Sequence, residues 1–284
     1  MFTLPQKIDS RPILITGAGT LGRRIALMFA TQSAEIRLYD LDETTRNEAV
    51  KYVNDTLPSI LDTPIEKHQY SVTVQDNLEN AVKDCWLIME CIPERRDIKI
   101  DLFAQLESIA PADAILASNS SSYPSSQLID KVKDPSRVLN VHFFMPPKVR
   151  ALELMSSGKT QPEIIDLLAK TFPRYSLTPY VAQQESTGFI FNRIWAAIKR
   201  EALMVVAEGV STPEDVDGLF KQCTGSPNGP FHLMDSVGLD VVLDIEEHYA
   251  KEDPNISELP RQLLREKVKQ GHLGVKSGQG FYKY

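Results

Sequence analysis

A glycine-rich segment near the N-terminus limits what this chain can fold into. Gly17-Ala-Gly19-Thr-Leu-Gly22 directly follows an apolar, β-rich run at 12–16 and precedes a helical pattern at 23–30. In a strand–turn–helix unit the first glycine makes the tight turn. The second lets backbone approach a pyrophosphate, and the third lets the helix pack closely on the strand. The helix N-terminus then faces the phosphates. The segment therefore predicts a dinucleotide-binding βαβ unit.

Asp40 supports this interpretation. It ends the next β-rich run, 35–40, and follows Gly17 by twenty-three residues. A carboxylate at that place accepts hydrogen bonds from both ribose hydroxyls and repels a 2′-phosphate, which predicts NAD rather than NADP. Arg23, Arg24 and Arg46 are cations nearby and weigh against the preference. The alternative is a structural turn with a solvated aspartate, but strand, helix and acid in register favour the dinucleotide site.

The rest of the first half alternates short apolar runs with helix-length amphipathic stretches. Such alternation predicts βαβ units and a largely parallel sheet, which right-handed crossovers make doubly wound. The predicted strands are 12–16, 35–40, 71–74, 86–92, 114–118 and 138–144, and the predicted helices between them include 23–30, 43–61 and 94–109.

From about residue 184 onward the pattern becomes helical. We predict a long helix at 188–208 with Ser186 and Thr187 as candidate N-caps. Another helix opens at Ser211-Thr-Pro-Glu-Asp, with proline in its first turn. Further helices are expected at 237–251 and 260–270, and no strand is expected after 184. The predicted fold is thus an α/β, Rossmann-type NAD-binding domain, 1–186, followed by an all-α C-terminal domain, 187–284.

Composition excludes several classes of function. Lys plus Arg is 31 and Asp plus Glu is 38, a formal charge of −7, so no positive surplus is available for a nucleic-acid backbone. The apolar runs are shorter than the roughly 20 residues of a membrane helix, and the N-terminal residues lack the apolar block of a secretory signal. The histidines and cysteines show no metal-binding spacing. We therefore expect no nucleic-acid or membrane partner, no metal, and a cytoplasmic location.

Polar side chains at predicted strand ends mark a candidate active site, because ligands of such sheets bind there. A serine-rich stretch, 117–122, follows one strand, His142 ends the next, and Glu153 lies in the apolar run beyond it. Histidine exchanges protons near neutral pH, and a carboxylate orients and stabilises the imidazolium. Each residue also has a simpler explanation. His142 could be a core histidine, the serine-rich stretch a polar loop and Glu153 an exposed strand residue. Asn192 could merely be tolerated near a helix start. These residues alone indicate a nicotinamide-dependent oxidoreductase.

Several ordered motifs give a more specific indication. The sequence resembles the short-chain 3-hydroxyacyl-CoA dehydrogenase family, which includes bacterial 3-hydroxybutyryl-CoA dehydrogenases, over nearly the whole chain. The motifs are Gly17–Gly22 with Asp40, Glu94 with Lys99, Ser118-Asn-Ser-Ser121, His142-Phe-Phe, Glu153, Gly188-Phe-Ile-Phe-Asn192-Arg, Gly229-Pro-Phe-x-Leu-x-Asp-x-Val-Gly-Leu-Asp240 and Gly274-Val-Lys-Ser-Gly-x-Gly-Phe-Tyr282.

The resemblance implies reversible, NAD-dependent oxidation of a 3-hydroxyacyl-CoA to the 3-ketoacyl-CoA, in fatty acid metabolism. It also implies a homodimer formed through the helical domain, which contributes to the substrate cleft. By motif position His142 is the general base and acid, and Glu153 is its paired carboxylate. Ser121 and Asn192 match side chains that hydrogen-bond the reacting oxygen and the histidine region.

The cofactor-binding positions implied by the resemblance begin in the glycine loop. Glu94 and Lys99 match residues near the nicotinamide ribose, and Asn119 matches a residue beside the nicotinamide. The full set is Gly17, Gly19, Thr20, Leu21, Gly22, Asp40, Glu94, Lys99 and Asn119.

The chain departs from the family pattern in two places. Members usually have Asn three residues after the histidine, where this chain has Met145, and the stretch from Met145 to Glu153 is one residue shorter. Members that bind the CoA phosphates are lysine-rich after Asp40, whereas residues 41–75 here offer as full cations only Arg46, Lys51 and Lys67.

These departures keep two alternatives open. One is the same chemistry on a non-CoA 3-hydroxy acid or a specialised-metabolite ketone. The other is a dinucleotide-binding scaffold that has lost catalysis. Met145 argues mildly for the scaffold, and the intact pair of His142 and Glu153 argues against it.

Overall fold

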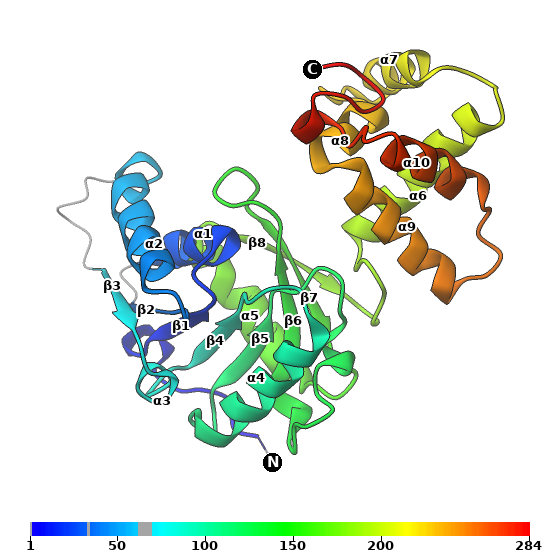
Figure 1. Ribbon diagram of the computed structural model, residues 1–284. Helices are drawn as coiled ribbons and strands as arrows, with labels where there is room; N and C mark the ends of the chain where they lie inside the picture. The colour runs from blue at the N-terminus through cyan, green and yellow to red at the C-terminus, as the bar shows by residue number, and fades with distance from the viewer. Residues whose placement is uncertain (1, 33–34, 62–69) are drawn as a thin grey trace. The chain divides into compact units, whose positions relative to one another are not determined.

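Eight strands form one mostly parallel sheet within the residues described by this computed structural model, 2–32, 35–61 and 70–284 (Figure 1). The strand order is β3-β2-β1-β4-β5-β6-β7-β8, and only β6 and β7 run antiparallel among these described neighbours. The order reverses between β1 and β4, which places a ligand-binding crevice at the C-terminal ends of these strands. The strands are β1 Ile13–Thr16, β2 Glu35–Tyr39, β3 Ser71–Gln75, β4 Leu87–Glu90, β5 Ile115–Ser118, β6 Val138–Phe143, β7 Ala151–Ser156 and β8 Thr178–Ala182.

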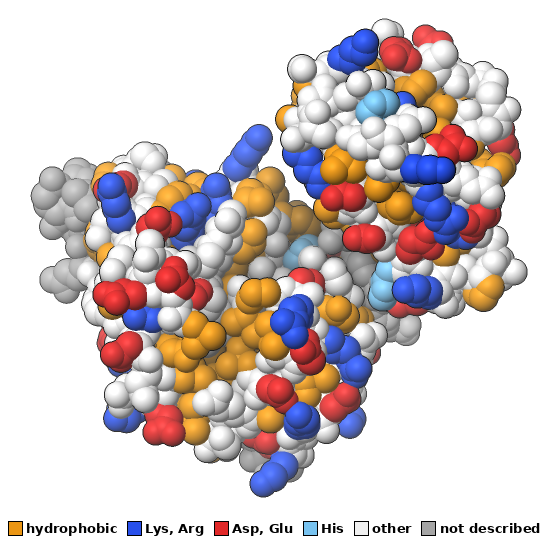
Figure 2. Space-filling model, viewed as in Figure 1, with side chains coloured by type: hydrophobic (Ala, Val, Ile, Leu, Met, Phe, Trp, Pro, Cys, Tyr) orange, Lys and Arg blue, Asp and Glu red, His pale blue; other side chains and the backbone are white. Residues whose placement is uncertain are grey.

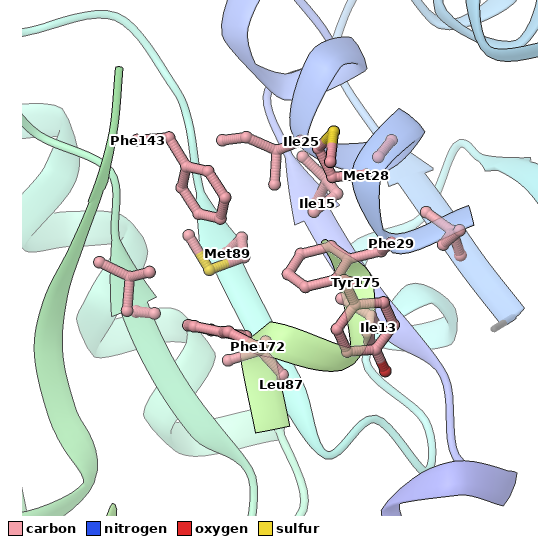
Figure 3. Close-up of a cluster of buried hydrophobic side chains, with 14 of the residues drawn as sticks. Ile13, Ile15, Ile25, Met28, Phe29, Leu87, Met89, Phe143, Phe172 and Tyr175 are labelled. Atoms are coloured by element: carbon pink, nitrogen blue, oxygen red, sulfur yellow. The ribbon is translucent and has the colours of Figure 1, made fainter. Parts of the chain in front are cut away.

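Helices cover both faces of this sheet. On one face α1 (Thr20–Ala30), α2 (Glu43–Thr56) and α5 (Pro162–Thr171) pack on the apolar side chains. Figure 3 shows Phe29 of α1 within this cluster; its ring meets Tyr175 and Phe143 edge-on, at 5.0 and 6.3 Å between centroids. On the other face α3 (Leu78–Ala81) and α4 (Arg96–Ile109) cover Leu14 and Ile88. Burial on both faces explains the continuous apolar runs of the central strands.

The chain divides into two compact units, Met1–Ile190 and Phe191–Tyr284; the predicted boundary lies after residue 186. The named elements of the second unit are all helices, around a core that includes Leu203, Phe231 and Leu264, and two isolated β-bridges lie near its end. The expectation of a doubly wound sheet followed by an all-α part is confirmed. The helices of the second unit are α6 Phe191–Ala207, α7 Pro213–Thr224, α8 Pro230–Val237, α9 Leu239–Glu252 and α10 Leu259–Lys269.

No helix within the described ranges combines the length and apolar character that crossing a bilayer requires.

Two predicted helix starts were wrong because of left-handed backbone. The helix predicted at 188–208 begins only at Phe191, so Ser186 and Thr187 do not cap it. Gly188 and Phe189 have φ angles of 73° and 56°, which cannot continue into a right-handed helix. Likewise Gly238, with φ 109°, separates α8 from α9 within the stretch predicted as one helix.

Other predictions missed a boundary or an element. The helix predicted at 43–61 ends at Thr56 and gives way to a 3₁₀ turn, Leu57–Ser59, with a proline in its first positions. Similarly α4 begins at Arg96, so Glu94 lies in the preceding loop. The strands β7 and β8 were not among those predicted. Lys67, counted above as a cation, lies outside the described residues.

Candidate active site

The three glycines of the first loop meet three different structural demands. Gly17 has φ 91° and its amide donates to the Tyr39 carbonyl at 2.8 Å, which makes the turn out of β1. A Cβ on Gly22 would lie 1.8 Å from the Gly17 carbonyl oxygen, so only glycine fits there. Gly19 caps α1, and a Cβ built on it meets nothing within 4 Å. This bare backbone at a helix N-terminus fits a pyrophosphate.

Asp40 lies directly beside this loop. Its carboxylate follows β2 and accepts hydrogen bonds from the Ala18 amide at 2.8 Å and the Asp42 amide at 3.1 Å. Thr20 is the first residue of α1, and the neighbouring Leu21 lines a cavity together with Asn119 and His142. The loop and the acid are therefore adjacent, as a site for the adenosine half of NAD requires.

His142 and Glu153 face one another across the antiparallel pair of β6 and β7. They are directly opposed in the strand register, and His142 Nδ1 lies 2.9 Å from Glu153 Oε2. Both side chains are buried, with exposed fractions of 5% and 2%. A hydrogen bond at Nδ1 fixes the ring orientation and leaves Nε2 as the nitrogen that can exchange a proton with a ligand.

A left-handed turn completes the surroundings of this pair. Because Gly188 and Phe189 have positive φ angles, the Phe189 ring stacks on His142, with 5.0 Å between centroids. The next amide, of Ile190, donates to Glu153 Oε1 at 3.0 Å. Phe144 meets the imidazole edge-on at 4.8 Å. The glutamate therefore has a donor on each oxygen, and aromatic rings pack against the histidine.

A cavity of about 330 Å³ joins the predicted site residues of the first unit. Asn119 is fixed at its wall because its Oδ1 accepts from the Phe143 amide at 2.9 Å. Ser121 enters from the loop after β5, with its amide 3.2 Å from Glu94 Oε1. The lining residues are Leu21, Cys91, Ile92, Glu94, Lys99, Asn119, Ser121, His142, Phe143 and Phe144. Residues implied for the cofactor and for catalysis thus share one cavity.

A buried ion pair that the sequence reasoning missed supports this cavity. Glu90, which ends β4 and is 0% exposed, accepts from Lys99 Nζ and Ser118 Oγ, each at 2.6 Å, and from the Ile92 amide at 2.9 Å. Burial raises the pKa of Glu90, and the Lys99 ammonium opposes that shift. A lone acid at the end of an otherwise apolar strand was the sequence signal for it.

Lys99 links this pair to the serine-rich loop. Its ammonium also lies 3.1 Å from Glu94 Oε2, and the two carboxylates raise the pKa of Lys99 although burial acts to lower it. Glu94 Oε1 in turn accepts from Ser120 Oγ at 2.5 Å and the Ser122 amide at 2.9 Å. Burial acts to raise the pKa of Glu94, but Lys99 and these donors bring it below its usual value.

Replacing Lys99 with methionine is expected to destabilise the protein, because it leaves Glu90 buried without its cation. Breaking a buried pair costs about 3–5 kcal/mol, or a fall of about 10 °C in Tm for a unit of this size. Thermal unfolding of the apo protein measures it. The matched control is Lys131→Met, which breaks the exposed Lys131–Asp101 contact and should cost less than about 1 kcal/mol. Equal losses in both variants would contradict the assigned role.

Asn192 was also predicted to join the site. It lies in the first turn of α6, in the second unit, and its role remains a prediction.

A histidine–carboxylate pair beside a dinucleotide loop suits removal of a proton while hydride passes to nicotinamide, and the fold and site together define an NAD-dependent oxidoreductase. Comparison with known proteins specifies the family. The NAD-binding domain of 3-hydroxyacyl-CoA dehydrogenase matches residues 12–185, and the C-terminal domain of the same enzyme matches residues 188–284. The chain therefore belongs to the 3-hydroxyacyl-CoA dehydrogenase family.

Individual relatives agree along the whole length. A probable 3-hydroxybutyryl-CoA dehydrogenase of Deinococcus radiodurans is 32% identical, over 95% of this chain and 99% of its own. The crystal structure of (S)-3-hydroxybutyryl-CoA dehydrogenase from Ralstonia eutropha is 27% identical, with a TM-score of 0.86 over 97% of this chain and 99% of that one. A 5-formyl-3-hydroxy-2-methylpyridine 4-carboxylate 5-dehydrogenase of Mesorhizobium japonicum is 28% identical, over 96% and 91%.

Proposed function

We propose that this protein catalyses the reversible oxidation of a 3-hydroxyacyl-CoA to the 3-ketoacyl-CoA, with His142 as general base and Glu153 as its orienting carboxylate. The observation that carries the proposal is the buried 2.9 Å contact between His142 Nδ1 and Glu153 Oε2, at a wall of the cavity that also contains Asn119 and Ser121.

Proton transfer follows from the position of the imidazole. With Nδ1 directed to Glu153, Nε2 of His142 takes the hydroxyl proton of the substrate, and the buried carboxylate stabilises the imidazolium that forms. Ser121 and Asn192 hydrogen-bond the reacting oxygen and the histidine region. In the reverse direction the same imidazolium returns its proton to the reduced oxygen.

The remaining residues hold the cofactor. NAD supplies the hydride acceptor when bound. The loop from Gly17 to Gly22 receives its pyrophosphate, and Asp40 accepts from the ribose hydroxyls. Glu94 and Lys99 lie toward the nicotinamide ribose, and Asn119 beside the nicotinamide. The aromatic rings against His142 exclude water from the place where hydride and proton leave the same C–OH group.

A homodimer formed through the helical unit, which also contributes to the substrate cleft, belongs to the same proposal, as does a cytoplasmic role in fatty acid metabolism. Support for the dimer comes from the helical unit, where Ile194 of α6, Leu219 of α7 and Val237 of α8 are exposed by 55%, 65% and 54%. Exposed apolar side chains of this size are typical of surfaces that a partner covers.

A second candidate keeps the chemistry but uses a substrate that is not a CoA thioester. It is favoured by Met145, an apolar side chain 41% exposed just beyond β6, and by the Mesorhizobium relative, whose name specifies a pyridine carboxylate. A scaffold without catalysis is disfavoured, because a buried and doubly hydrogen-bonded His142–Glu153 pair has no evident structural use.

The deciding measurement is NADH consumption by the purified protein with acetoacetyl-CoA, beside free acetoacetate and an NADPH control. We expect rapid turnover with the thioester and NADH, and little with NADPH because Asp40 repels a 2′-phosphate. Turnover of free acetoacetate alone would select the second candidate. If neither acetoacetyl-CoA nor free acetoacetate is turned over while NADH still binds, the proposed activity is overturned and only the assignment of the cofactor site remains.

A further inference from the structure

Two adjacent arginines of α1 lie against one tyrosine of α2, and the second of them also contacts the segment that follows β6. The guanidinium carbons of Arg23 and Arg24 lie 5.0 and 5.5 Å from the ring centroid of Tyr52 on α2. Arg24 also donates to the Tyr52 hydroxyl at 3.2 Å and to the Pro146 carbonyl at 3.1 Å. Pro146 is four residues beyond His142 in the sequence, so this cluster adjoins the chain that leads out of the proposed active site.

The positive charge of this cluster is not compensated by the described residues. Neither arginine has a carboxylate within 4.0 Å among them, whereas Arg11 of the same unit is paired with Asp113 at 2.6 Å. The Nε atoms of Arg23 and Arg24 are both shielded from solvent without an acceptor in the described part of the chain. Two guanidinium groups beside one ring repel each other, and an anion between or beside them removes that cost.

Arg46 is a further arginine on the helix that carries Tyr52. It belongs to α2, donates to the backbone carbonyl of Asp40 at 2.5 Å, and likewise has a buried Nε without an acceptor among the described residues. Figure 2 shows Lys and Arg side chains over α1 and α2, with Asp and Glu side chains among them. The feature that sets Arg23 and Arg24 apart is therefore their lack of a paired carboxylate among the described residues, and not a broad basic surface.

We infer that Arg23, Arg24 and Tyr52 form a phosphate-binding subsite for the CoA portion of the substrate. The inference rests on the proposed function and names the residues that would make the thioester selective. Guanidinium groups bind phosphate through paired N–H donors, and Tyr52 holds both in place by cation–π contact. The arginines of α1 thus supply the charge that the lysine-poor segment after Asp40 lacks.

The position of the cluster favours the substrate over the cofactor. Leu21, which faces the cavity shared with His142 and Asn119, precedes the arginines on α1, but neither arginine lines that cavity. Arg24 is bonded instead to the segment after β6, which departs from the family pattern at Met145. A cofactor 2′-phosphate is disfavoured because Asp40 lies beside the glycine loop.

The test compares substrates with and without phosphates. In the double variant Arg23→Gln/Arg24→Gln, KM for acetoacetyl-CoA should rise at least about tenfold, with little change in kcat. KM for acetoacetyl-pantetheine, which has no phosphate, should be the same in variant and wild type. Arg174→Gln, which removes an exposed arginine paired with Asp9, is the matched control and should leave both KM values unchanged.

Binding measurements separate the possible outcomes. Calorimetry is carried out with CoA, dephospho-CoA and pantetheine. The affinity for CoA should depend on the two arginines, whereas the affinity for pantetheine should not. The affinity for dephospho-CoA identifies which phosphate is bound. Unchanged CoA affinity in the double variant would overturn the proposed subsite. A tenfold loss of NADH affinity would also overturn it, because the arginines would then belong to the cofactor site. If wild type turns over no thioester, the proposed function fails, and arginine-dependent CoA binding still decides the subsite. Arg23→Lys/Arg24→Lys, which keeps the charge, should recover part of the affinity if the glutamine variant is poorly folded.

Discussion

Replacing His142 with glutamine is expected to lower kcat for acetoacetyl-CoA reduction by roughly 10³-fold, because general acid–base catalysis by a positioned group contributes about 10²- to 10⁴-fold. Glutamine fills a similar space and can still hydrogen-bond, but it exchanges no proton. NADH affinity should stay within about twofold, since the glycine loop and Asp40 are untouched. Steady-state kinetics and NADH fluorescence titration measure the two quantities.

Two further variants show whether this loss is specific. His248→Gln changes an exposed histidine of α9 that pairs with Glu252 and should leave kcat unaltered. Glu153→Gln should lower kcat in the same direction as His142→Gln, because the imidazolium loses its buried counter-charge. If the His142 variant kept more than a tenth of the wild-type kcat, the assignment of the general base would be wrong.

The second large effect is expected at Gly22. Alanine there would place its Cβ 1.8 Å from the Gly17 carbonyl oxygen and 3.3 Å from an Ile15 side-chain carbon, so α1 must move away from β1. Overpacking of this kind costs about 3 kcal/mol or more, a fall of about 6–12 °C in Tm for a unit of this size. NADH affinity should fall with it, since the phosphate loop is displaced. Calorimetric melting of the apo protein and NADH titration are the measurements.

Gly19→Ala is the matched control, because a Cβ at that position meets nothing within 4 Å and the backbone of Gly19 is extended. Its apo Tm should change little, whereas NADH affinity should still fall if the pyrophosphate passes over this residue. Together the variants separate packing from phosphate binding. A Gly22→Ala protein with the wild-type Tm would show that the helix and strand can part at little cost.

The parts of the fold that were predictable are those with a local signal. Strands buried on both faces, such as β1 and β4, appear in the sequence as continuous apolar runs, and the turn at Gly17 has one well-defined chemistry. Thr212 caps α7 through the amide of Asp215, where the Ser-Thr-Pro-Glu-Asp segment predicted a helix start. These features depend on residues that are close in the sequence, so individual residues are enough to predict them.

The features that were missed depend on distant partners. β8 lies at the sheet edge with Pro179 in it and Tyr180 exposed, so its sequence lacks the apolar run of a central strand. Nothing in the local sequence indicates that Phe189 adopts a left-handed conformation, in which its ring stacks on His142. Glu90 gains its role only from Lys99, which α4 brings to it. The contact between His142 and Glu153 was implied by the family resemblance alone, because the pairing of β6 with β7 that makes it has no local signal in the sequence.

The pairing of β6 with β7 makes the geometry of the proposed catalytic pair independent of the segment between the two strands. Because His142 and Glu153 are opposed in the ladder register, their separation is set by backbone hydrogen bonds and not by the length of 144–150. A slip of one residue would turn one side chain to the other face, whereas residues gained or lost between the strands leave the pair intact. The shorter segment in this chain is therefore compatible with an unchanged dyad. Insertion and deletion in this segment can therefore change the surroundings of the pair while the proposed proton-transfer chemistry is inherited unaltered.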